Sequence, residues 1–243
     1  MERPRKSMTG RATTVRDRGR DRARPRRSPE PGPRTVPVWS VVAVTAALLA
    51  ASGVARAIDR PLVAPPGPVL LVGDSLFFQS ANELERALRG DGWTVRTAAV
   101  PGAGIAGGGY VEGFRWPPEL EEQVAQWRPT VAVVELGTNG CGTGCRSVPD
   151  AIDDVLAALH GVDLVLWLTV RTTAPRPGDP EAVNDHLEEA ARTVVHLELL
   201  RYDRWFRGRS ELVRPDGVHL TAEGQRALAH RVRAALRDRA GLS

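Results

Sequence analysis

The sequence of 243 residues has only two cysteines, and it contains neither an internal repeat nor the pattern of a second domain. It also lacks a surplus of positive charge where a nucleic-acid-binding domain would need one. Residues 1–34 carry 12 Arg or Lys against 4 acids, whereas residues 35–243 carry 21 against 25. A folded nucleic-acid binder would carry the basic surplus on the domain itself, so this class of function is excluded.

The N-terminal quarter of the chain has the composition of a tail and a membrane segment. Residues 1–34 are rich in Arg, Pro, Ser and Gly without apolar periodicity, which predicts a disordered cytoplasmic tail. The chain then runs without a charge from Thr35 to Ala55, long enough as a helix to span about 30 Å. We predict a transmembrane signal anchor at 35–57, with everything after it outside the cytoplasm. Cleavage after Ala57 is the alternative, which would make the segment a signal peptide and the protein secreted.

A short linker at 58–67 leads into one predicted domain at 68–243, in which strand-like and helix-like patterns alternate. The strands are continuous apolar runs, as expected when helices cover both faces of a parallel sheet. This alternation predicts a three-layer α/β/α sandwich with five strands. We expect strands at 69–72, 93–98, 131–136, 164–168 and near 196–200, and helices at 76–89, 119–127, 149–159, 180–191 and 221–237.

The first strand leads directly into the stretch around which the domain is organised. The apolar run Val69–Val72 stops at Gly73, Ser75 follows two residues later, and a helical pattern begins after it. A serine there has its Oγ at the carboxyl end of a strand, beside helix N–H groups that favour negative charge. The alternative is that Ser75 only caps the helix, with Asp74 assisting.

Three further blocks stand where the predicted strands end or where the last helix begins: residues 100–104, 137–140 and 216–221. Together with Ser75 they permit acyl transfer, because His219 can act as the base and Asp216 can orient its imidazole. A tetrahedral oxyanion would need donors, for which the backbone N–H groups of Ser75 and Gly102 and the Asn139 amide are candidates. Each block alone also fits an ordinary turn.

These four blocks resemble the SGNH hydrolase superfamily, whose members are also called GDSL esterases and lipases. They read Gly-Asp-Ser-Leu at 73–76, Pro-Gly-Ala-Gly at 101–104, Gly-Thr-Asn at 137–139 and Asp-Gly-Val-His at 216–219. The resemblance covers residues 68–238 and implies a flavodoxin-like sheet, no metal and no cofactor. It implies these roles: nucleophile Ser75, base His219, orienting acid Asp216, and oxyanion donors Ser75, Gly102 and Asn139.

The chain departs from the family pattern after the third block, where Cys141 and Cys145 lie in a glycine-rich loop. Outside the cytoplasm these cysteines are expected to form a disulfide, which would stiffen the segment that carries Asn139. Because its loop is very small, any gain would come from local geometry and not from loop entropy. A metal site is the alternative, but no histidine pair accompanies the cysteines.

Substrate contacts are expected from the glycine-flexed loop that bears Tyr110, Phe114 and Trp116, although these aromatics could equally pack the next helix onto the sheet. Trp205 and Phe206 form a second candidate wall. The sequence thus predicts an extracytoplasmic serine esterase that cleaves short acyl esters, with cell-envelope glycans or lipids as substrates. An O-acyltransferase needs the same residues and stays open as the alternative, and a non-catalytic envelope-binding module is a third interpretation. The oligomeric state is not predicted.

Overall fold

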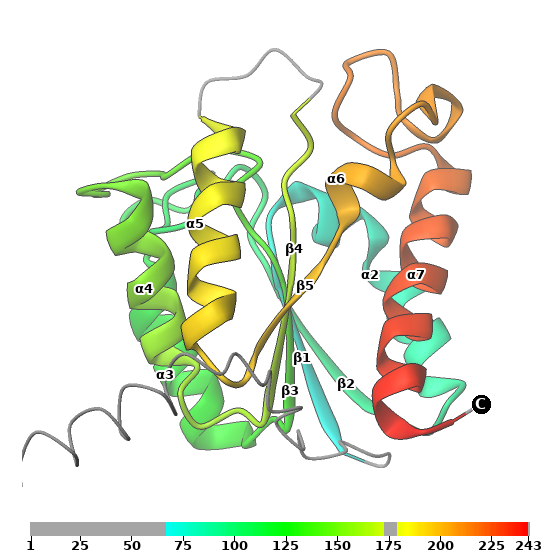
Figure 1. Cartoon of the computed structure of the whole chain (residues 1–243), viewed down its shortest axis with the longest axis horizontal. Coiled ribbons are helices and arrows are strands. Elements are labelled where there is room, and N and C mark those ends of the chain that lie inside the picture. The colour runs from blue at the N-terminus through cyan, green and yellow to red at the C-terminus, as the bar shows by residue number, and fades with distance from the viewer. Residues whose placement is uncertain (1–66, 173–178, 243) are drawn as a thin grey trace, which may run out of the picture. The chain divides into compact units, whose positions relative to one another are not determined.

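The computed structural model describes residues 67–172 and 179–242. In these residues five parallel strands form one sheet in the order β2-β1-β3-β4-β5 (Figure 1). The strands are β1 (Pro68–Gly73), β2 (Thr94–Ala99), β3 (Val131–Glu135), β4 (Leu164–Leu168) and β5 (Leu197–Leu200). The predicted α/β/α sandwich is confirmed, and its strand order is the flavodoxin-like one.

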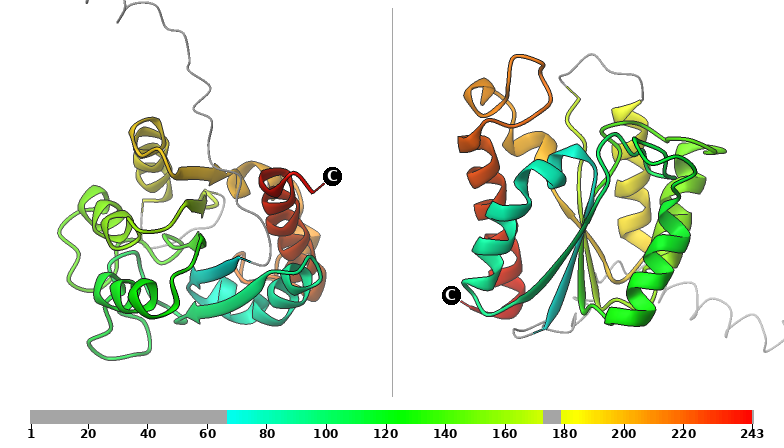
Figure 2. Two further views of the ribbon diagram at one scale, coloured as in Figure 1. Left: turned by 90° about the horizontal axis from the view of Figure 1, so that it is seen from below. Right: turned by 180° about the vertical axis from the view of Figure 1, so that it is seen from behind.

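Helices cover both faces of the sheet. Helices α3, α4 and α5 pack on one face, and α2 and α7 pack on the other (Figure 2). Their bounds are α2 (Ser75–Arg89), α3 (Trp116–Trp127), α4 (Val148–Ala158), α5 (Pro180–Thr193) and α7 (Ala222–Ala240). The short helix α6 (Tyr202–Trp205) and the 3-10 helix η1 (Ser210–Leu212) were not predicted, because segments this short carry no periodic signal.

The central strands explain why the sequence shows continuous apolar runs. In β1, Leu70 and Val72 belong to the core under α3, α4 and α5, whereas Val69 and Leu71 belong to the core under α2 and α7. All four side chains are completely buried. Since successive side chains point to opposite faces and both faces are covered, every position in the strand is apolar.

Helix α2 begins at once after β1. The residue that caps it is Asp74, whose side chain accepts a hydrogen bond from the Leu76 N–H (2.9 Å). Ser75 is the first helical residue, so the alternative that Ser75 is the cap is wrong. Gly73 permits this abrupt entry, because a Cβ there would lie 2.6 Å from the Cβ of Phe77. The Ser75 hydroxyl is therefore left available for other partners.

The strand register places the predicted blocks along one edge of the sheet. Gly73 at the end of β1 pairs with Ala99 of β2 on one side and with Glu135 of β3 on the other. The loops that follow these three strands therefore start at the same level, at the carboxyl edge where sites in such sheets form.

The predicted N-terminal tail (1–34), the membrane segment (35–57) and all of the linker except residue 67 lie outside the described residues. Within residues 67–172 and 179–242, no helix is long and apolar enough to cross a bilayer. The signal anchor and the signal peptide thus both remain predictions.

Candidate active site

The structure brings Ser75, His219 and Asp216 into one hydrogen-bonded chain. The Nε2 atom of His219 lies 3.1 Å from the Oγ of Ser75, although 144 positions separate the two residues in the sequence. The Nδ1 atom of His219 lies 2.9 Å from the Oδ2 of Asp216. This is the arrangement in which an imidazole can take a proton from a hydroxyl while a carboxylate holds its other nitrogen.

The residues from 213 to 220, which we call the histidine loop, hold Asp216 and His219 by local bonds. The Oδ1 atom of Asp216 accepts the backbone N–H groups of Val218 (2.8 Å) and His219 (2.9 Å). Val213 and Leu220 close the loop through an antiparallel bridge, and the loop ends where α7 begins. One oxygen of Asp216 thus fixes the turn while the other faces the imidazole.

The histidine loop is open to solvent. The Asp216 side chain is 47% exposed and the His219 side chain is 38% exposed. The hydrogen bond with His219 nevertheless lowers the pKa of Asp216 to about 2, and the two backbone N–H groups act in the same direction. Asp216 is therefore ionised at neutral pH and can balance a positive charge on the imidazole.

The predicted oxyanion donors include two backbone N–H groups, those of Ser75 and Gly102. Ser75 is the first residue of α2, and Gly102 lies in the loop after β2 with φ = +78°. In the described part of the chain neither N–H has a hydrogen-bond acceptor. Gly102 needs to be glycine, because side-chain-bearing residues rarely adopt this φ. Both groups can thus donate to a bound substrate.

Asn139 makes contacts that the sequence did not reveal. Its Nδ2 atom donates to the Oδ2 of Asp74 (2.7 Å) and to the carbonyl oxygen of Ala103 (3.1 Å). Asn139 therefore joins the loops that follow β1, β2 and β3. Because an amide NH₂ group has two hydrogens, both are engaged in this structure.

The loop after β2 packs tightly against the loop after β3. The N–H groups of Ile105 and Ala106 donate to the carbonyl oxygens of Gly140 (3.0 Å) and Cys141 (2.8 Å). A Cβ on Gly104 would lie 2.4 Å from the backbone nitrogen of Gly142, so only glycine fits at this contact. The position of Gly102 is thus coupled to that of Asn139.

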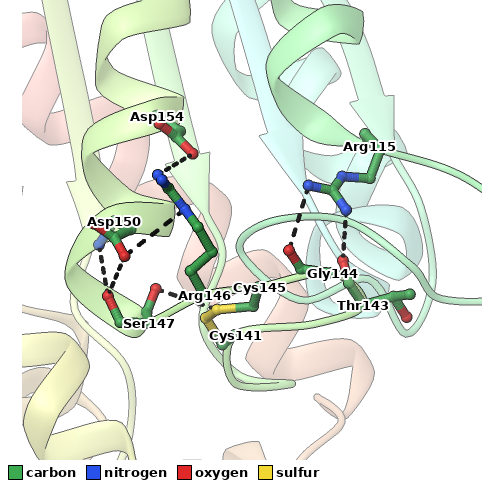
Figure 3. The surroundings of a disulfide bond; sticks show 9 residues. All are labelled: Arg115, Cys141, Thr143, Gly144, Cys145, Arg146, Ser147, Asp150 and Asp154. Atoms are coloured by element: carbon green, nitrogen blue, oxygen red, sulfur yellow. Dashed lines mark hydrogen bonds and ion pairs between the residues drawn. A yellow bond between two sulfur atoms is a disulfide. The ribbon is translucent and has the colours of Figure 1, made fainter.

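Cys141 and Cys145 are paired as a disulfide within this contact, with their Cα atoms 5.7 Å apart (Figure 3). The guanidinium of Arg115 donates to the carbonyl oxygens of Thr143 (3.2 Å) and Gly144 (3.5 Å) in the bridged loop. The disulfide loop is therefore tied to the chain just before α3. The two sulfurs bind each other, and the described residues gather no group of three or more side chains that could hold a metal ion.

The three aromatics predicted to contact substrate have different environments. Tyr110 is 89% exposed, and its ring borders Gly102, where an added Cβ would lie 3.7 Å from the ring. Trp116 is completely buried, and Phe114 packs edge-on against it with ring centroids 4.7 Å apart. Trp116 and Phe114 therefore pack against each other, and Trp116 is not accessible to a substrate in this structure. Tyr110 remains a candidate for substrate contact.

Trp205 and Phe206, the second pair of candidate substrate contacts, also differ in their exposure. Phe206 is buried in the core under α2 and α7, whereas Trp205 is half-buried and carries the guanidinium of Arg209 over its ring at 4.7 Å. Phe206 thus serves packing, and only Trp205 retains an accessible surface.

A pair of buried acids was missed in the sequence. Asp74 is completely buried, and Glu135 at the end of β3 is 3% exposed. The sequence did contain one indication of a polar site here. Glu135 is the only charged residue in the otherwise apolar strand Val131–Glu135, and Asn139 follows it four residues later. We call Asp74, Glu135 and Asn139 the carboxyl floor, because they lie at or just after the carboxyl ends of β1 and β3, where α2 starts.

Known proteins resemble this chain over the part that contains the candidate site. The model described as "GDSL-like Lipase/Acylhydrolase family" matches residues 71–227. A protein of Staphylococcus aureus strain MSSA476, named "Putative O-acetyltransferase", is 27% identical over 172 residues, and the same holds for its counterpart in strain N315. The alignment covers 70% of this chain and 25% of the relative, so the chain spans about a quarter of the length of the curated relatives it matches.

Solved structures share the fold. The C-terminal catalytic domain of peptidoglycan O-acetyltransferase A from Streptococcus pneumoniae is 15% identical with a TM-score of 0.52, covering 72% of this chain and 94% of that domain. TesA is 24% identical with a TM-score of 0.54, covering 71% of this chain and 99% of that one. Est24, a carbohydrate acetylesterase from Sinorhizobium meliloti, is 16% identical with a TM-score of 0.52, covering 71% and 99%.

The family match covers more than half of the chain and includes all four sequence blocks, from the serine to the histidine. The sheet order is the one that these blocks led us to expect. The protein therefore belongs to the GDSL-like lipase/acylhydrolase family, within the SGNH hydrolase superfamily, whose members act on esters.

Proposed function

We propose that this protein is an extracytoplasmic serine esterase that hydrolyses short acyl esters, above all acetyl esters, on cell-envelope glycans or lipids. The observation that carries the proposal is the unbroken chain of hydrogen bonds from Ser75 through His219 to Asp216. A serine hydroxyl is a weak nucleophile until a base removes its proton, and His219 is within reach to do so.

In this mechanism the Oγ of Ser75 attacks the ester carbonyl carbon while the Nε2 of His219 takes the hydroxyl proton. Asp216 holds the Nδ1–H and stabilises the imidazolium. The tetrahedral intermediate then collapses, and His219 returns the proton to the departing alcohol oxygen. Water attacks the resulting acyl-Ser75 with His219 again as base, which releases the acid and restores the serine.

The oxyanion of each tetrahedral intermediate would be held by the N–H groups of Ser75 and Gly102, which have no other acceptor in the described residues. The Asn139 amide would be the third donor. Both hydrogens of this amide are engaged, so one hydrogen bond must break before the amide can donate to the oxyanion. The bond to the Ala103 carbonyl would break, because it is longer (3.1 Å) than the bond to Asp74 (2.7 Å). The bond to Asp74 would keep the amide in place during this exchange.

The openness of the site is compatible with a bulky alcohol in the ester. Asp216 and His219 are both partly exposed, and Phe78, one turn after Ser75, is 61% exposed. Together with the exposed Tyr110, Phe78 offers aromatic surface on which a sugar ring could stack. The location outside the cytoplasm rests on the predicted membrane segment at 35–57, through which the domain would be held at the membrane.

A second candidate function is O-acetyl transfer, in which a sugar hydroxyl and not water attacks the acyl-Ser75. It is favoured by the similarity to curated proteins named as O-acetyltransferases. The two activities share every step up to the acyl-enzyme and differ in the acceptor.

The test is to replace Ser75 and His219 separately by alanine and to measure hydrolysis of p-nitrophenyl acetate. We expect each change to reduce kcat/KM by at least about 10³-fold, with thermal unfolding little changed. The matched controls are Ser210→Ala and His230→Ala, which replace an exposed serine and an exposed histidine away from the site. Activity that persists in either Ser75→Ala or His219→Ala would contradict the mechanism.

A second measurement on the active protein shows whether water or a sugar hydroxyl accepts the acyl group. With an acetylated donor and an added glycan, free acetate indicates hydrolysis, whereas an acetylated glycan indicates transfer. Acetylated glycan as the main product would replace the esterase proposal by the second candidate.

A further inference from the structure

The two buried acids of the carboxyl floor lie at the carboxyl ends of β1 and β3, next to the start of α2 where Ser75 stands. Gly73 and Glu135 are paired in the register of β1 and β3, and the backbone N–H of Asp74 donates to the carbonyl oxygen of Glu135 (3.3 Å). The Asp74 carboxylate is also close enough to raise the pKa of the Glu135 carboxyl. Two ionised carboxylates would repel each other in this buried space, so one member of the pair is expected to carry a proton.

The hydrogen bonds decide which acid holds the proton. The oxygens of Asp74 receive the N–H of Leu76 and the amide of Asn139, and Asp74 stands at the N-terminus of α2, where negative charge is favoured. These donors stabilise the ionised form of Asp74. Glu135 accepts the Thr138 hydroxyl on Oε1 (2.9 Å), and the backbone N–H of Asp74 lowers the pKa of Glu135 in the same direction, but its buried Oε2 has no hydrogen-bond partner. The proton therefore belongs on Oε2 of Glu135.

The surroundings of Glu135 oppose its ionisation. Burial raises the pKa of Glu135 well above its ordinary value, and the negative charge of Asp74 acts in the same direction. Tyr202, the first residue of α6, is 2% exposed, and burial raises the pKa of its own hydroxyl. The positive charge of Arg171, after β4, acts on the pKa of Tyr202 in the opposite direction.

We propose that Glu135 is a positioning residue that stays protonated and donates a hydrogen bond from Oε2 to Asp74, so that Asp74 can hold the Asn139 amide at the oxyanion site. The inference rests on the proposed function, because it assigns Asn139 a part in catalysis. Ionising Glu135 would place a second negative charge beside Asp74 in a buried space. Asp74 would then be repelled, and both its cap on α2 and its bond to Asn139 would weaken.

The test compares Glu135→Gln with Glu135→Leu across the pH range. The glutamine amide donates to Asp74 at every pH and its oxygen still accepts from Thr138, whereas leucine can do neither. We expect kcat of the wild type to decline at alkaline pH as Glu135 ionises. Glu135→Gln should keep kcat within about threefold of the wild type at pH 7 and should lack this decline. Glu135→Leu should lose about tenfold or more in kcat at every pH, the usual effect of removing a hydrogen bond to a charged group.

Glu198→Gln is the matched control, since it makes the same chemical change on the neighbouring strand β5, where Glu198 pairs with Arg239 and not with the site. It should leave the alkaline decline unchanged. Glu135→Gln as inactive as Glu135→Leu would overturn the proposal, and so would an alkaline decline equal to that of the wild type.

Two measurements on the folded protein do not depend on activity. The carboxyl ¹³C signal of Glu135 should stay in its protonated position through neutral pH, and an ionised signal there would overturn the inference. The stability should also depend on pH. With a raised folded pKa, the contribution of Glu135 is complete below its unfolded pKa of about 4.5 and is lost as the pH rises toward the folded pKa.

The wild type should therefore lose stability relative to Glu135→Gln as the pH rises above about 4.5, and an unchanged difference between them would contradict the proposal. These results also separate the two proposals. If Ser75→Ala kept its activity, the proposed function would fail, yet the ¹³C titration and the unfolding curves would still report on Glu135.

Discussion

The histidine loop and the carboxyl floor both adjoin Ser75, and they use carboxylates in opposite environments. In the histidine loop, Asp216 is half exposed, and its pKa is lowered by a direct hydrogen bond. In the carboxyl floor, Asp74 and Glu135 are almost completely buried, and burial raises the pKa of Glu135. The same kind of side chain thus gives an ionised partner for a base on one side and a neutral hydrogen-bond donor on the other.

The two regions also differ in how they are assembled. Asp216 and His219 are three residues apart, and a single turn brings them together. Asp74, Glu135 and Asn139 come from the ends of two neighbouring strands, and only the sheet register aligns them. A base can move slightly and still transfer a proton, whereas oxyanion donors act through fixed geometry. We infer that the local, exposed arrangement suffices for the base and that burial serves to hold the donors.

The largest expected effect is that of Asp216→Asn, which tests the histidine loop. Because the backbone N–H groups of Val218 and His219 bind one oxygen of residue 216, the amide nitrogen would face Nδ1 of the histidine. An N–H donor there favours the imidazole tautomer that carries its proton on Nε2, which cannot accept the serine proton. We expect kcat to fall by about 10³- to 10⁴-fold in steady-state assays.

Thermal unfolding of Asp216→Asn should stay within a few degrees of the wild type, because the loop keeps its backbone bonds and the site is exposed. A loss of activity below tenfold would mean that His219 is oriented by something other than Asp216.

The next effect tests the carboxyl floor. Asn139→Ala removes the proposed third oxyanion donor and also leaves Asp74 with one donor fewer. We expect kcat to fall by about 10²- to 10³-fold with KM changed little, since the donor acts mainly in the transition state. The free energy of unfolding, measured by denaturant titration, should also fall by about 1 kcal/mol.

This coupled loss distinguishes the two regions, because Asp216→Asn is expected to affect activity alone. A stable Asn139→Ala variant with nearly normal kcat would assign the oxyanion contacts to the two backbone N–H groups alone.

The smallest effect is expected at the disulfide. The double change Cys141→Ser and Cys145→Ser removes the bridge from the loop that packs against residues 104–106. Since the bridged loop is very small, we expect Tm to fall by about 2–4 °C and kcat to fall by a few-fold. The proposed oxyanion donors would be positioned less precisely in this double variant, whereas proton transfer between Ser75 and His219 should be unchanged.

The corresponding control is the pH profile of kcat/KM, which should keep its shape in the double variant. A changed profile would mean that the disulfide loop also positions His219. Mass spectrometry of the purified protein without reductant reports whether the bridge is present, and two free thiols would remove the basis of this prediction.

Much of the fold could be read from local patterns. The five strands lie within two residues of their predicted bounds, because runs such as Val131–Val134 are apolar throughout and leave few alternatives. The helices were also recognised, although α3 begins at Trp116 and not near residue 119, since two prolines in its first turn hid the start. Asp216 and His219 could be paired in advance because they share one turn.

Other features depended on long-range contacts. Trp116 and Tyr110 belong to the same glycine-rich segment, yet one is buried and the other exposed, and nothing in their local sequence separates them. The cap of α2 is Asp74 because the turn after Gly73 aims its side chain at the Leu76 N–H. The bond between Asn139 and Asp74 joins residues 65 positions apart, which local spacing does not indicate.

The sequence by itself determined the order of strands and helices, the four blocks and the local pairing of Asp216 with His219, because each depends on residues within a few positions of one another. Only the tertiary structure decided that His219 reaches Ser75, that Asn139 is held by Asp74 and that Glu135 is buried beneath them. Those contacts form where separate strands end side by side, and burial sets the protonation of an acid only once the sheet and its helices have closed around it.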